Sequence, residues 1–175
     1  MINPRLNLKK RLYWNSRGSE KVVLRMSPET MTDISIQRID SMPRDRIFVD
    51  TSAWYAIIDK NDRDHKAAVK KVRILDRPLL TSNYIFDEIL TLLKTRLGPS
   101  IAIPFGQKLW DQEASALVRI TEEDEEKAWG MFRQYEDKGF SFTDCTSFAL
   151  MERLDINTVF AFDDHFVQYG KFVIL

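Results

Sequence analysis

One stretch decides the fold: Arg46-Ile47-Phe48-Val49-Asp50-Thr51-Ser52. Its short continuous run of apolar, β-favouring residues predicts a strand that is buried on both faces within a parallel sheet. The helical pattern over residues 53–58 would begin at a cap provided by Thr51 or Ser52. Asp50 would then lie at the carboxyl end of a central strand, where open α/β sheets bind ligands. The alternative is that Asp50 serves only as a helix cap.

The same alternation of strand and helix continues along the chain. Four further strands are predicted, over residues 79–81, 117–120, 158–162 and 172–175. Between them the apolar periodicity predicts helices over about 62–75, 84–97 (capped by Asn83 and ended by Gly98), 99–113, 121–137 and from 143 onward. The acids at the start of the 121–137 helix are expected to be solvated. This alternation predicts an α/β fold with a parallel sheet and right-handed crossovers.

Residues 1–45 fall outside this pattern and are interpreted as an N-terminal extension to a domain at residues 46–175. Residues 1–19 carry five basic residues and no acid, which is typical of a mobile tail. Residues 22–26 predict a short strand, and Ser27-Pro28-Glu29 predicts a capped helix start. This opening resembles the start of a ribbon-helix-helix protein, but too little chain precedes Ile47 for the rest of that fold.

The composition is that of a soluble globular protein, with 44% hydrophobic and 30% charged residues. A single cysteine excludes an internal disulfide framework and fits a reducing cytoplasm. No apolar run approaches the roughly 20 residues of a membrane span, and no secretory signal is recognised. Residues 46–175 hold 21 acidic and 17 basic residues, which argues against a DNA-coating basic surface. We therefore expect a cytoplasmic protein without membrane contact.

Four acids are expected at one edge of the sheet. Asp50 and Asp163 follow strands, whereas Glu88 and Asp144 lie on helices. In a doubly wound sheet these positions converge, and the acids would repel one another unless a divalent cation neutralised them. Oxygen ligands favour Mg²⁺ or Mn²⁺, and such sites serve in-line attack of metal-bound water on a phosphodiester. The sequence has neither a nucleotide-binding glycine loop nor a serine elbow.

Four motifs together carry a family resemblance: Val-Asp50-Thr-Ser-Ala, Asp-Glu88-Ile-Leu-Thr, Phe-Ser-Phe-Thr-Asp144-Cys-Thr-Ser-Phe and Phe-Asp163-Asp-His-Phe. The combination resembles PIN-domain ribonucleases, and more narrowly the VapC-type toxins of prokaryotic toxin–antitoxin pairs. The resemblance covers nearly all of residues 46–175. It implies a three-layer sandwich around a parallel sheet and a Mg²⁺- or Mn²⁺-dependent endonuclease acting on structured RNA. It also implies a homodimer and a cognate antitoxin that covers the site.

The resemblance also implies roles for individual residues. Its catalytic acids fall on Asp50, Glu88, Asp144 and Asp163. Of these, all but Glu88 are expected to hold one metal ion directly or through water. Glu88 would orient or deprotonate the attacking water, or hold a second ion. The positions that support metal waters and carboxylates fall on Thr51, Ser52 and Ser147.

The two adjacent acids after the fourth strand are expected to differ. Asp163 directly follows the last apolar strand residue, as Asp50 does, so Asp163 is assigned to the metal site. Asp164 is assigned to the cap of the next helix, worth about 1 kcal/mol. His165 is expected to pack or to contact phosphate, because hard-cation sites prefer oxygen ligands.

Two other functions fit parts of the sequence. A non-catalytic module could bind RNA or a partner with the acids kept only as caps, but binding alone requires basic groups and not clustered carboxylates. A Mg²⁺-dependent phosphatase would use an Asp-x-Asp pair, and Ser52 occupies the second position after Asp50. For the homodimer, we expect one of Trp54, Trp110 and Trp129 at the interface and at least two in the core.

Overall fold

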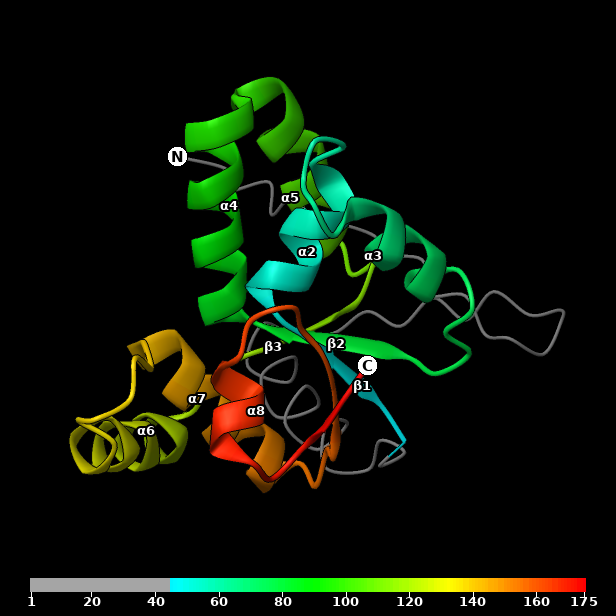
Figure 1. Ribbon diagram of the computed structural model, residues 1–175. Coiled ribbons are helices and arrows are strands. Elements are labelled where there is room, and N and C mark those ends of the chain that lie inside the picture. Colours follow the sequence, from blue (N-terminus) through cyan, green and yellow to red (C-terminus); the bar gives the residue numbers. More distant parts are fainter. Residues whose placement is uncertain (1–44) are drawn as a thin grey trace, which may run out of the picture. The chain divides into compact units, whose positions relative to one another are not determined.

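The computed structural model describes residues 45–175 (Figure 1). The tail, strand and helix start that the sequence predicts over residues 1–29 lie outside the described residues. Within residues 45–175, no helix combines the length and the apolar character needed to cross a membrane.

The described chain is built on one five-stranded parallel sheet with strand order β3-β2-β1-β4-β5. The strands are β1 (Ile47–Val49), β2 (Leu79–Ser82), β3 (Ala116–Val118), β4 (Thr158–Phe160) and β5 (Val173–Ile174). Ile47 pairs with Leu79 on one side and with Thr158 on the other, so β1 is the central strand. All three residues of β1 are fully buried, as the apolar run predicted.

Seven helices cover the sheet within the described residues: α2 (Thr51–Ile58), α3 (His65–Val72), α4 (Asn83–Leu97), α5 (Pro99–Trp110), α6 (Glu122–Gln134), α7 (Phe142–Arg153) and α8 (His165–Tyr169). Helices α2 to α5 lie on one face of the sheet and α6 to α8 on the other, as Figure 1 shows. The predicted three-layer α/β sandwich is confirmed.

The strand order reverses between β1 and β4. From β1 the chain crosses outward to β2 and β3, then returns over the opposite face to β4 and β5. The loops after β1 and β4 are joined directly, because Asp50 N donates to Phe160 O (3.0 Å) and Phe162 N donates to Ser52 Oγ (2.9 Å). Ligand sites of open α/β sheets lie at such a reversal, on the carboxyl side of the strands.

Three helices are shorter than predicted because local turns limit them. Asp62 accepts from Asp64 N through its side chain (2.8 Å) and from His65 N through its carbonyl (3.1 Å), so a turn precedes α3. Gln112 has a φ of 57°, which ends α5 at Trp110. The cap of α6 at Tyr135 likewise leaves the helical region.

The start of α4 differs from the sequence prediction. Ser82, not Asn83, is the N-cap, and its hydroxyl accepts from Ile85 N (3.1 Å). The Asn83 side chain instead accepts from Ile120 N (2.7 Å), and so ties α4 to the end of β3. Either residue type can cap a helix, so only the tertiary contact distinguishes them.

The acidic start of α6 is not wholly solvated, contrary to expectation. Asp124 is 2% exposed and forms two hydrogen bonds of 2.8 Å with the Arg153 guanidinium. The expectation of at least two buried tryptophans is also wrong. Trp54 is buried, whereas Trp110 and Trp129 are 49% and 52% exposed.

Candidate active site

Asp50 caps a helix and also lies near the acids Asp144 and Asp163. The cap interpretation and the site interpretation of this residue are therefore compatible. It is the N-cap of α2, accepting at Oδ2 from Ser52 N (2.8 Å) and from Ser52 Oγ (2.6 Å). The expected cap from Thr51 or Ser52 is therefore wrong. Burial of Asp50 and the nearby charge of Asp163 raise the pKa of Asp50 well above its usual value. The hydrogen bonds from Ser52 act in the opposite direction but do not cancel this rise.

Glu88 reaches the cluster from α4, on the same side of the sheet as α2. Thr51 Oγ1 donates to Glu88 Oε2, which joins the first turn of α2 to the middle of α4. Partial burial raises the pKa of Glu88, and the charges of Asp144 and Asp163 add to this rise while the Thr51 hydrogen bond opposes it. Glu88 is thus a half-buried carboxylate held in place by a predicted supporting residue.

Asp144 is held by a capping box at the start of α7. Ser141 N donates to Asp144 Oδ2 (2.6 Å), and Asp144 N donates to Ser141 Oγ (3.0 Å). This Ser-x-x-Asp spacing orients the carboxylate before any ligand binds. Asp144 is 7% exposed, and burial raises its pKa despite the Ser141 hydrogen bonds and the charge of His165.

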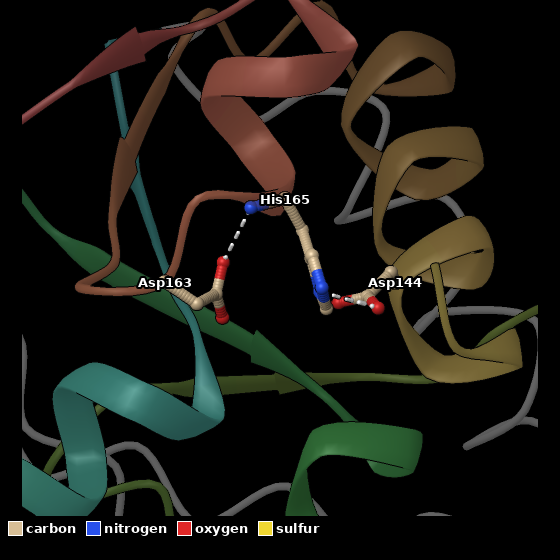
Figure 2. A group of neighbouring side chains, drawn as sticks. All are labelled: Asp144, Asp163 and His165. Carbon is tan, nitrogen blue, oxygen red and sulfur yellow. Dashed lines mark hydrogen bonds and ion pairs between the residues drawn. The ribbon is translucent and has the colours of Figure 1, made fainter. Parts of the chain in front are cut away.

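Asp144, Asp163 and His165 form a compact group of possible metal ligands within the described residues. One donor atom from each lies within 4.8 Å of the others. Figure 2 shows the three side chains converging from the start of α7, the loop after β4 and the start of α8. His165 Nδ1 lies 2.9 Å from Asp144 Oδ2, and His165 N donates to Asp163 Oδ1 (3.0 Å). This group includes His165, which the sequence analysis did not assign to the metal, and does not include Asp50.

The three predicted supporting residues have distinct positions. Thr51 and Ser52 contact Glu88 and Asp50 as described above. Ser147 lies one turn after Asp144 on α7, is fully buried, and its Oγ has no hydrogen-bond partner among the described residues. Carboxylate oxygens such as those of Asp144 and Asp163 are ligands that suit a hard divalent cation.

The prediction that the Asp164 side chain caps the helix after the fourth strand is wrong. Asp164 occupies the N-cap position of α8, but its carboxylate makes no cap hydrogen bond, and it is Asp163 that accepts from His165 N. An exposed carboxylate with no cap bond adds little stability.

We therefore expect Asp163→Asn and Asp164→Asn to behave differently. Asp163→Asn removes a charge from the compact group, so Mn²⁺ binding should weaken at least about 10-fold. Asp164→Asn should leave metal binding unchanged and the free energy of unfolding within about 0.5 kcal/mol. Isothermal titration with Mn²⁺ and thermal melts of both variants test this. Loss of the metal in Asp164→Asn alone would show that the assignment is one residue out.

Comparison with known proteins gives one consistent result. The PIN domain family matches residues 47–172. The 23S rRNA-specific endonuclease VapC20 of Mycobacterium tuberculosis is 34% identical over 127 residues, which span 71% of this chain and 94% of that protein. The crystal structure of that VapC20, a sarcin–ricin loop cleaving toxin, matches with a TM-score of 0.68 and 31% identity, over 71% of this chain and 95% of that one. A toxin–antitoxin complex from Klebsiella pneumoniae shares the fold at a TM-score of 0.54 and 10% identity, over 74% and 95%.

Proposed function

This chain is a member of the PIN-domain family and, within it, of the VapC-type toxins, and on that premise we propose that it is a metal-dependent endoribonuclease. The family resemblance drawn from its four motifs is thereby confirmed. The observation that supports the proposed activity is that donor atoms of Asp144, Asp163 and His165 lie within 4.8 Å of one another, with Asp50 and Glu88 near enough for the charges of Asp144 and Asp163 to raise their pKa values. The mutual repulsion of these acids favours a bound Mg²⁺ or Mn²⁺ ion.

In this proposal each acid has a task. Asp144 and Asp163, with Asp50 beside them, hold the cation directly or through water. When bound there, a divalent cation would supply a water molecule of lowered pKa and stabilise negative charge on a phosphate. Glu88, positioned by Thr51, orients or deprotonates the attacking water, or contributes to a second cation. Ser52 supports the Asp50 carboxylate from α2, and Ser147, one turn after Asp144 on α7, would support the water shell of the cation. The capping box of α7 and the hydrogen bonds to Asp50 and Glu88 keep the geometry fixed before RNA arrives.

A non-catalytic binding module accounts for these observations less well. Asp50 and Asp144 are buried carboxylates with raised pKa values, which a structure retains at a cost in stability unless they bind something. A module that only binds RNA gains nothing from them, because they repel phosphate.

The substrate proposed first is structured ribosomal RNA, since the relative VapC20 is specific for 23S rRNA. Purified protein should be incubated with total RNA, with and without Mn²⁺ or Mg²⁺, and the new RNA ends mapped by sequencing. The proposal expects discrete cuts within structured loops that appear only with the ion. Scattered or ion-independent ends would contradict it.

We also propose a cognate antitoxin that covers the site, as in a toxin–antitoxin pair, so that expression of this chain alone slows growth. Residues 1–45 are proposed as an extension to the nuclease domain at residues 46–175. The cytoplasm is the proposed compartment, because RNA is accessible there and the single buried Cys145 stays reduced.

The proposed homodimer would form through an exposed aromatic surface on α6. Trp129 and Phe132 stack with their ring centroids 5.9 Å apart and are 52% and 40% exposed. The edge of the Phe142 ring packs against Phe132 at 6.1 Å, which extends this surface to the start of α7 beside Asp144. Large exposed aromatic side chains of this kind are enriched at interfaces.

Replacing Trp129 and Phe132 together with alanine should weaken dimerisation at least about 10-fold, because such anchors dominate interface energies. Light scattering across a dilution series measures this. Trp110→Ala is the matched control, since Trp110 is equally exposed but lies on α5. A monomeric wild type at micromolar concentration, or an equal effect of the control, would count against this interface.

A further inference from the structure

The imidazole of His165 is held against the carboxylates of the site. Its Nδ1 atom lies 2.9 Å from Asp144 Oδ2, and its backbone N is bonded to Asp163. The opposite ring atom, Nε2, faces Gly139, where a Cβ atom would lie 3.8 Å away. The ring also packs against Phe140 in an edge contact, with the centroids 5.7 Å apart. These contacts aim Nδ1, and not Nε2, into the group formed with Asp144 and Asp163 (Figure 2).

A cation held by Asp144 and Asp163 would therefore meet a nitrogen donor as well as oxygen donors. The three donor atoms lie within 4.8 Å of one another, a separation that ligands of one ion can adopt. Imidazole is a good ligand for first-row transition metals, whereas Mg²⁺ is bound by carboxylates, phosphates and water. The sequence predicted that His165 would not bind the metal, because a site made only of oxygen ligands was expected. The position of Nδ1 beside the two carboxylates adds a nitrogen donor to that site.

From this geometry we infer that His165 ligates the cation through Nδ1 and makes the site select a transition metal such as Mn²⁺ over Mg²⁺. This inference rests on the proposed metal site but not on RNA cleavage. The competing explanation is that His165 only forms an ion pair with Asp144. In that case a bound cation would replace the imidazole and would be surrounded by oxygen alone.

Pulsed electron paramagnetic resonance of Mn²⁺ bound to the full chain, without a histidine tag, separates these explanations. A directly bound imidazole produces ¹⁴N modulation of the Mn²⁺ spin echo, and an oxygen-only site does not. The chain contains two histidines, so His65 provides the matched control. His65 lies in α3, where its Nδ1 is bonded to Ala56 O (2.8 Å). The modulation should be present in the wild type and in His65→Ala, and absent in His165→Ala and His165→Asn.

Binding titrations provide an independent measurement. His165→Ala should weaken Mn²⁺ binding at least about 10-fold and leave Mg²⁺ binding nearly unchanged, because only the transition metal uses the nitrogen. The inference would be overturned by the absence of ¹⁴N modulation in the wild type, or by modulation that persists in His165→Asn. Equal losses of Mn²⁺ and Mg²⁺ affinity in His165→Ala would also overturn it. Modulation from a protein that cleaves no RNA would support the ligand and refute the nuclease. RNA cleavage by a protein without ¹⁴N modulation would support the nuclease and refute His165 as a ligand.

Discussion

Replacing Asp144 with asparagine should abolish RNA cleavage, lowering the rate at least about 100-fold, while the protein stays folded. The substitution removes one negative charge from the site with almost no change in shape. The amide oxygen of asparagine can still accept the hydrogen bond from Ser141 N, so the capping box of α7 survives. Single-turnover cleavage of a mapped RNA, together with a thermal melt, measures both effects.

The chain offers a closely matched control in Asp124. Asp124 is the corresponding acid of the capping box of α6 and is also buried. It forms an ion pair with Arg153, which ends α7, whereas Asp144 lies in the first turn of that helix. Burial alone would raise its pKa, but the hydrogen bonds from Arg153 outweigh this and lower it. Asp124→Asn should therefore lower the free energy of unfolding by roughly 1–3 kcal/mol and leave cleavage intact. If both variants lost activity equally, stability rather than metal chemistry would explain Asp144.

The metal-free protein should become less stable as the pH rises from about 5 to 7.5. Asp50, Glu88 and Asp144 all have raised pKa values in the folded state, chiefly because they are buried. Above the unfolded value of about 4, the folded state then binds more protons than the unfolded state, so rising pH favours unfolding. Glu152 behaves oppositely: hydrogen bonds from Lys127, Lys171 and Tyr169 outweigh its burial and lower its pKa to about 2. Its stabilising contribution is complete above pH of about 4.5 and does not affect this window.

Adding Mn²⁺ should reverse this loss of stability. At a concentration 100 times the dissociation constant, a ligand of the folded state adds about 2.7 kcal/mol, which raises the melting temperature by roughly 5–10 °C. Melts in EDTA and in Mn²⁺ at pH 5 and pH 7.5 test both effects. Asp50→Asn is the informative variant, because it removes the most buried acid of the cluster and should flatten the pH dependence in EDTA. Stability that rises with pH in EDTA would contradict the clustering of charged acids.

The central strand and the position of Asp50 directly after it were predictable from sequence because local chemistry encodes them. The run from Ile47 to Val49 must be buried on both faces, and an acid directly after a central parallel strand falls at the ligand edge. Asp163, and not Asp164, lies with Asp144 and His165. The predicted strand was too long, however, because β4 ends at Phe160 and Asp163 does not directly follow it. The assignment of Asp163 to the metal stays a prediction.

The features that sequence did not predict depend on partners distant in the chain. Asp124 is buried because Arg153, 29 positions later, pairs with it. Ser82 and not Asn83 caps α4, because the Asn83 side chain accepts a hydrogen bond from Ile120 N instead. The approach of His165 to Asp144 requires α7 and α8 to lie side by side on one face of the sheet, which no local pattern specifies. Exposure of Trp110 and Trp129 likewise follows from helix packing and not from residue type.

The most direct test of the central claim is an ion titration of RNA cleavage by the full chain. The protein is stripped with EDTA, freed of the chelator, and mixed with total RNA that includes 23S rRNA, while Mn²⁺ is added in steps. We expect no new RNA ends without the ion, and a single set of ends that grows to saturation as the ion is added. Equal cleavage in excess EDTA, or no cleavage at any ion concentration, would contradict it.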